Sequence, residues 1–243
     1  RFADASDFTF IFTGDFDQEQ LLELAATYLA TLPSTNSKES ALWQEPSFPE
    51  GIKSATVRKG LEEQSQVFIA FGGDLPQVDA ATAYQESEML SMLQNLLDIR
   101  LRELIREDKS GTYGVSVWAT MTLVPQRNFI VEISFGCQPG REQELTDAIL
   151  EEIEHLRTSL VAESYLVKLR ESYRRSKGTA LKTNSYWARM AASATLRGFP
   201  TTTIADTETI PNMVTPEVMR QLARTYLDPS NYVVVFLEPE TER

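Results

Sequence analysis

The sequence has one cysteine and one histidine among its 243 residues. With Cys137 alone, no internal disulfide can form, and its place at the end of an apolar run predicts a buried thiol rather than a nucleophile. His155 alone cannot complete H-E-x-x-H or H-x-x-E-H, since each motif needs two histidines. We therefore expect this chain to hold no zinc by itself. His155 falls near the end of a predicted helix, where it should cap the helix or face solvent.

Long apolar runs and an excess of positive charge are missing too. No stretch reaches the ~20 apolar residues of a membrane span, so we expect none. No P-loop and no G-x-G-x-x-G motif is present. The net charge of −12 disfavours binding to nucleic acid and to anionic membrane surfaces. One helical segment is locally basic, and it is either a solvated face or a docking surface for a partner. Its basic residues are Lys168, Arg170, Arg174, Arg175, Lys177 and Lys182.

The order of apolar runs, helix caps and loop residues along the chain predicts an α+β fold. The apolar run Phe8–Thr13 predicts a buried strand, and Asp17 is the expected N-cap of a helix that stops at Pro33. Residues 33–53 should form a long surface loop. Further strands are expected near 54–59, 65–71, 113–123, 128–135 and 232–237. Further helices are expected near 80–106, 145–156, 163–196 with a break near Asn184, and from Thr215–Pro216 onward.

These elements predict one domain over residues 1–243. Its sheet should be mixed and largely antiparallel, with about six strands and with helices covering one side. The chain opens with Arg1 rather than Met, and we expect it to be a fragment of a longer precursor.

Several segments, in order, resemble pitrilysin-like (insulinase-type, inverzincin) zinc peptidases. They are D-F-T-F-I-F-T-G-D-F-D at the start, L-R-E-L-I-R-E-D-K-S-G-T-Y-G-V from Leu101, N-S-Y-W from Asn184, and the stretch from Thr215 to the last strand. The resemblance implies a clamshell of four similar αβ domains, of which the first carries the inverted zinc motif. Without that motif, this chain resembles a later, non-catalytic domain that closes over the peptide substrate.

The resemblance also implies two substrate-binding residues, Arg106 and Tyr113. In the fourth domain of such enzymes an Arg and a Tyr seven positions apart reach the bound peptide near the zinc, although second domains can show a similar local pattern. A fixed cation and a phenol donor can stabilise the oxyanion of peptide hydrolysis. The alternative is structural, with Arg106 capping its helix and Tyr113 packed in the sheet.

The resemblance further implies the cofactor, the partners and the compartment. Zinc would lie in the N-terminal domain of the parent protein, and the partner would be that catalytic half or a separate subunit. Long bacterial members of the family are exported, which implies a periplasmic location. Two other interpretations remain open: a zinc-less scaffold or partner subunit of the same family, and an independent binding module unrelated to proteolysis.

Overall fold

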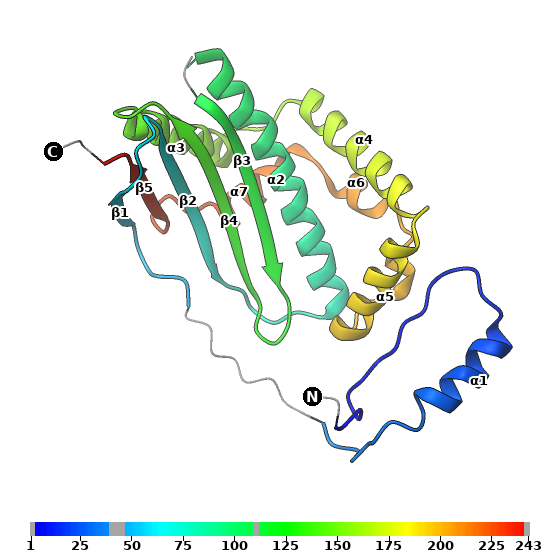
Figure 1. The fold of residues 1–243 in the computed structure, drawn as a ribbon. Coiled ribbons are helices and arrows are strands. Elements are labelled where there is room, and N and C mark those ends of the chain that lie inside the picture. Colours follow the sequence, from blue (N-terminus) through cyan, green and yellow to red (C-terminus); the bar gives the residue numbers. More distant parts are fainter. Residues whose placement is uncertain (1–2, 39–46, 109–111, 241–243) are drawn as a thin grey trace.

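The computed structural model describes residues 3–38, 47–108 and 112–240 (Figure 1). Its strands are β1 (Lys53–Arg58), β2 (Ser65–Asp74), β3 (Thr112–Thr122), β4 (Asn128–Cys137) and β5 (Val233–Glu238). Its longer helices are α1 (Gln18–Tyr28), α2 (Ala80–Asp108), α3 (Glu142–Thr158), α4 (Glu163–Ala180), α5 (Asn184–Arg197) and α7 (Pro216–Tyr226). Two short ones are η1 (Thr201–Thr203) and α6 (Thr209–Met213).

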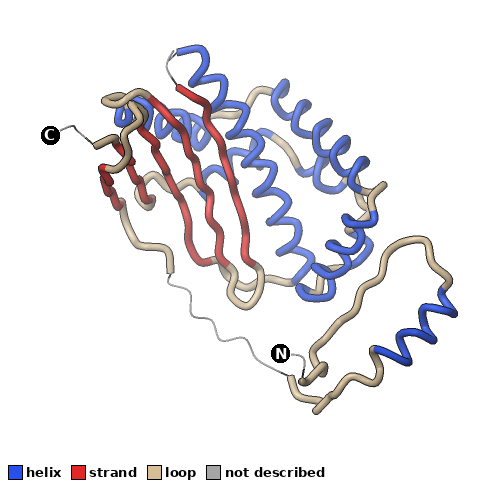
Figure 2. The backbone as a smooth tube through the Cα atoms, viewed as in Figure 1, coloured by secondary structure: helices blue, strands red, loops and turns tan. Residues whose placement is uncertain are grey.

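The five strands form one mixed sheet in the order β1-β5-β2-β4-β3. β1 and β5 run parallel, whereas β2 pairs antiparallel with β5 and β4, and β3 pairs antiparallel with β4. Apart from α1, the described helices lie on one side of this sheet (Figures 1 and 2). The predicted α+β class and the one-sided cover are therefore confirmed. The described residues contain five strands in the sheet, against the six expected.

The core lies between the long helix α2 and the covered face of the sheet. Leu93, Leu97 and Leu101 of α2 are fully buried, as are Val131 and Ile133 of β4. Burying one Leu-sized side chain stabilises a fold by roughly 1.5–3 kcal/mol. The buried leucines of α2 thus make its packing on the sheet the main contact between the helices and the sheet.

The N-terminal segment differs from the prediction. Residues 8–13 are extended but belong to no strand of the sheet, and Phe8, Phe10 and Phe12 are 39–49% exposed. Asp17 caps α1 as expected, because its side chain accepts a hydrogen bond from the Gln20 backbone N–H. Helix α1 nevertheless buries no residue, and residues 3–38 lie apart from the sheet (Figure 1). The predicted buried strand is wrong for the described residues, because this segment pairs with neither edge of the sheet, β1 or β3, and its phenylalanines stay exposed.

The remaining boundaries follow the sequence signals. The long helical stretch breaks between α4 and α5, where the Thr183 hydroxyl caps α5 by accepting from the Tyr186 N–H. Gly198 ends α5 in the left-handed conformation, with φ +77°. Thr215 caps α7, as predicted, and Pro216 is its first residue. Local capping chemistry therefore sets where these helices begin and end.

The exposure of the N-terminal segment leads to a test by truncation. None of residues 3–38 is buried, so we expect deletion of residues 1–46 to change the free energy of unfolding by no more than about 0.5 kcal/mol, the range of surface changes. Thermal melts of the 243-residue chain and of the truncated chain would measure this. A large loss of Tm would instead support the prediction of a single cooperative domain over residues 1–243.

Candidate substrate-facing site

Arg106 and Tyr113 occupy neighbouring ends of two packed elements. Arg106 lies in the last turn of α2, and Tyr113 is the second residue of β3. β3 is the edge strand of the sheet, and α2 packs along it. The backbone thus brings both positions to one end of the domain. Their side chains fall outside the described structure, so their substrate-binding role stays a prediction.

The backbone beside Tyr113 is irregular. Thr112 pairs with Cys137 and Gly114 with Gly136, and the register shifts between these two pairs. Gly114 has φ +123°, a conformation that residues with a Cβ rarely adopt. Irregularities of this kind commonly re-aim a side chain at the rim of a sheet or next to an active site. The shift therefore gives position 113 a backbone direction that differs from that of a regular edge strand.

None of the described helices lies on the other face of the sheet, which carries large apolar side chains. Phe68 of β2, Trp118 of β3 and Ile130 of β4 are 40%, 54% and 36% exposed. They alternate along their strands with buried residues such as Ile69 and Val117. We call the surface formed by Phe68, Trp118 and Ile130 the open face. Antiparallel sheets usually place polar residues on the face that contacts solvent. An exposed face that carries apolar residues marks an interaction site.

Polar groups are interleaved with the apolar ones on the open face. Ser116 pairs in register with Ser134, and their hydroxyls are 2.9 Å apart. Trp118 lies across from Glu132 of β4. Apolar area with a few fixed polar groups is the usual composition of a binding surface. This surface was not predicted from the sequence, although the outward positions of the predicted strands, with an aromatic at 68 and another at 118, could have indicated it.

A short segment before β1 covers one side of the open face. The Phe48 ring packs so closely on Gly72 of β2 that a Cβ at Gly72 would lie 2.4 Å from it. Gly72 is therefore needed for close approach. Residues 47–53 belong to the predicted surface loop at 33–53, and here that loop contacts the sheet.

The predicted basic surface of α4 is only partly a surface. Arg174 pairs with Glu208 at 2.8 Å, and Arg170 pairs with Glu163 at 2.6 Å while donating to the Val214 carbonyl. Lys177 is buried. Arg170 and Arg174 hold α4 to the segment that contains α6, whereas Lys168, Arg175 and Lys182 are exposed to solvent.

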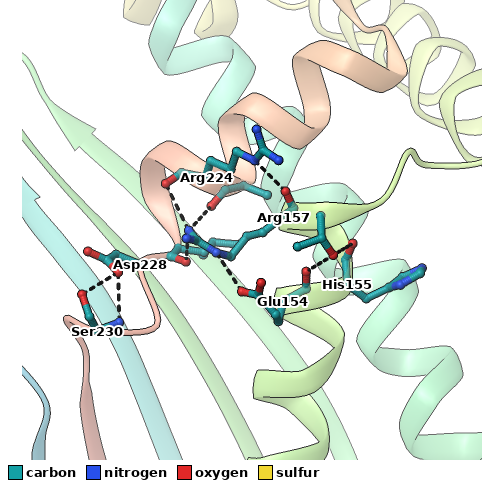
Figure 3. A network of polar contacts seen from close by, with 9 residues as sticks. Glu154, His155, Arg157, Arg224, Asp228 and Ser230 are labelled. Atoms are coloured by element: carbon teal, nitrogen blue, oxygen red, sulfur yellow. Dashed lines mark hydrogen bonds and ion pairs between the residues drawn. The ribbon is translucent and has the colours of Figure 1, made fainter.

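His155 lies at the edge of a polar network that joins two helix ends (Figure 3). Arg157 of α3 donates to the carbonyls of Leu227 at 2.8 Å and Arg224 at 3.2 Å, and Arg224 of α7 donates back to the Arg157 carbonyl at 2.7 Å. Each helix end is thus capped by an arginine of the other. The His155 ring points away from this network and is exposed, which matches the predicted position.

The described residues contain neither a cluster of metal ligands nor a reactive thiol. No group of three or more His, Cys, Asp or Glu side chains there could hold a metal ion. Cys137 is buried, as predicted, and burial raises the pKa of its thiol to about 11. A thiol with so high a pKa is protonated at neutral pH and is a poor nucleophile. Within the described helices, none is both long and apolar enough to cross a membrane.

The fold is that of an α+β domain, and a model of a known domain family matches most of the chain. The model described as the Peptidase M16 inactive domain matches residues 1–173, and the chain belongs to this family. It is also 26% identical over 147 residues to the probable zinc protease PqqL of Haemophilus influenzae. That match covers 59% of the chain and 15% of the relative.

Solved structures show the same fold. The periplasmic protease PqqL of Escherichia coli aligns with a TM-score of 0.74 at 22% identity, over 93% of this chain and 25% of that one. The ferredoxin protease FusC, solved as a mutant with Arabidopsis ferredoxin, gives 0.74 at 20% identity, over 93% and 24%. The first half of PqqL also aligns, with a TM-score of 0.72 at 14% identity, over 93% and 50%. This chain thus spans about a quarter of the FusC and PqqL chains, and its fold recurs within the first half of PqqL.

The small number of potential zinc ligands predicts the metal content and the peptidase activity of the isolated chain. With one histidine in the sequence, we expect the isolated chain to bind no stoichiometric zinc and to cleave no peptide. Metal analysis of protein purified without chelators, with a peptidase assay alongside, would measure both. One tightly bound zinc per chain together with activity that chelators abolish would contradict the prediction.

Proposed function

We propose that this chain is the non-catalytic, substrate-enclosing C-terminal domain of a zinc metalloendopeptidase. The observation that carries the proposal is membership of the M16 inactive-domain family in a chain whose single histidine cannot form the zinc motif. The relative from H. influenzae is described as a probable zinc protease and is several times longer. Zinc would be held in the N-terminal part of the parent, which would be the partner of this domain.

The open face is the surface that would enclose the peptide. Phe68, Trp118 and Ile130 offer apolar area to side chains of a bound peptide, and Ser116 and Ser134 offer hydroxyls. A domain that closes over the substrate excludes water from the reaction and positions the peptide. The helical layer packed behind the sheet supports this surface from the other side.

Arg106 and Tyr113 would act where the enclosed peptide reaches the zinc. Hydrolysis at zinc creates an oxyanion in the transition state. A guanidinium and a phenol O–H aimed at that charge would stabilise it, or would hold the substrate carbonyl. Their backbone positions at one end of the domain, beside the irregular start of β3, support this role.

One alternative belongs to a different class of function. A zinc-less scaffold or partner subunit would keep the same fold with no peptidase activity, and it would lack H-x-x-E-H in the parent sequence as well.

For the active form we propose a periplasmic location, because the E. coli structure with this fold is a periplasmic protease.

Two substitutions in the full-length enzyme test the pair. We expect Tyr113→Phe and Arg106→Ala each to lower kcat by roughly 10²–10³, the cost of removing a donor aimed at transition-state charge. Tm should change little, since merely structural surface residues cost roughly 0.5 kcal/mol or less. Kinetics and thermal melts of both variants are the measurements. Wild-type activity in both would leave Arg106 and Tyr113 as ordinary helix-end and sheet residues.

The open face is tested by a change in substrate affinity. Trp118→Ser should raise KM about tenfold, which corresponds to about 1.4 kcal/mol of lost contact, with little change in Tm. Leu196→Ser is the matched control, because Leu196 is 71% exposed on α5, in the helical layer. Equal KM values in the two variants would argue against enclosure by this face.

A further inference from the structure

Lys177 is a buried cation that the proposed function does not use. It lies in the last turn of α4, and its residue is 7% exposed. Its ammonium donates to the Tyr84 hydroxyl at 3.3 Å, the Tyr173 hydroxyl at 3.4 Å and the Thr203 carbonyl at 3.5 Å. All three are longer than the usual 2.7–3.2 Å of N–H···O bonds. The charge is therefore held loosely and by neutral oxygens.

The other basic residues of this helix that face α6 are paired differently. Arg170 and Arg174 each reach a carboxylate within 2.8 Å, whereas no ion pair of Lys177 within 4.0 Å occurs among the described residues. Burial lowers the pKa of the Lys177 amine, although the charges of Glu88 and Asp206 oppose this effect. A buried ammonium without a direct anionic partner is costly, and a bound anion would satisfy it.

A cavity of about 80 Å³ opens beside this ammonium. Its lining includes Tyr84, Tyr173, Lys177, Asp206 and Thr209. Since a cavity needs roughly 10–15 Å³ of this kind to hold one water molecule, the cavity has room for a ligand of about five heavy atoms. The Tyr84 hydroxyl accepts from Lys177, so its own proton is free to be donated. Two donors that suit a carboxylate thus converge here.

Asp206 adds a charge of the opposite sign to the same cavity. Its carboxylate accepts from the backbone N–H groups of Glu208 at 2.9 Å and Thr209 at 3.0 Å, and hydrogen bonds from Thr209 above all lower its pKa. It is therefore ionised at neutral pH. A simple carboxylate would be repelled by Asp206, whereas a small ligand that also carries an ammonium group would be attracted to both charges.

We propose that this cavity binds a small α-amino acid of glycine or alanine size in its zwitterionic form. Lys177 and the Tyr84 hydroxyl would hold the carboxylate, and Asp206 would attract the ammonium. The site draws on side chains from α2, α4 and the segment around α6. It lies within the helical layer, away from the open face, and does not depend on peptidase activity.

Ligand-observed saturation-transfer NMR on the full-length protein would test the proposal with glycine as the probe. We expect saturable binding with a dissociation constant on the order of 1 mM, the weak range for so small a ligand. Acetate and methylamine each lack one of the two charges, so each should bind at least about tenfold more weakly than glycine. Acetate binding as tightly as glycine, or no saturable glycine signal, would overturn the proposal.

Substitutions assign the binding to this cavity. Lys177→Met should abolish glycine binding, and Lys182→Met, a change at an exposed lysine just beyond the same helix, should leave it unchanged. Lys177→Met replaces a buried charge by an apolar chain of similar length, so we expect no loss of Tm. If it does not fold, Tyr84→Phe serves instead, since it keeps the ring and removes one donor. Undiminished glycine binding in a folded Lys177→Met or Tyr84→Phe variant would refute the assignment.

Discussion

The packing of α2 against one face of the sheet is the contact on which the rest of the domain depends. Leu93, Leu96, Leu97 and Leu101 are fully buried on this helix, and Val131 and Ile133 are fully buried on the facing strand. A sheet can bury one face in this way while the other stays available. Because α2 ends next to the start of β3, the same contact fixes the backbone positions of Arg106 and Tyr113. One-sided packing thus produces both the open face and the end of the domain where a substrate would be met.

Much of this fold could be predicted because its signals are local. The apolar stripe of α2, the Thr caps of α5 and α7, and the Pro-bearing turn between β3 and β4 each act within a few residues of chain. Residues 8–13 have an equally strong strand pattern, yet they pair with nothing in the described sheet. A pattern reports that a segment favours an extended, buried state, but it does not report which sheet will receive it. The backbone places of Arg106 and Tyr113 followed from local signals, whereas their proposed role came from resemblance.

The surfaces that the sequence did not predict depend on contacts between distant segments. Phe68 and Trp118 were assigned to strands, but the absence of helices from their face follows only from how the helices cross the sheet. Lys177 belonged to a basic run typical of a solvated helix face. It is buried because Tyr84, 93 residues earlier, and Thr203, 26 residues later, close around it. Charge patterning along one helix cannot show such a contact.

The arginines explain how an acidic chain links the helices of its helical layer. Arg157 and Arg224 cap each other's helices, Arg170 and Arg174 hold α4 to the segment around α6, and Arg100 joins α2 to Glu152 of α3 at 2.7 Å. A guanidinium can bind two or more carbonyl or carboxylate oxygens at once, so a few arginines suffice to link several helices. The net charge of −12 therefore coexists with a layer cross-linked by cations. For the open face, which we propose encloses a peptide, a sheet held in place by such links would lose less entropy on binding than one that had to be ordered first.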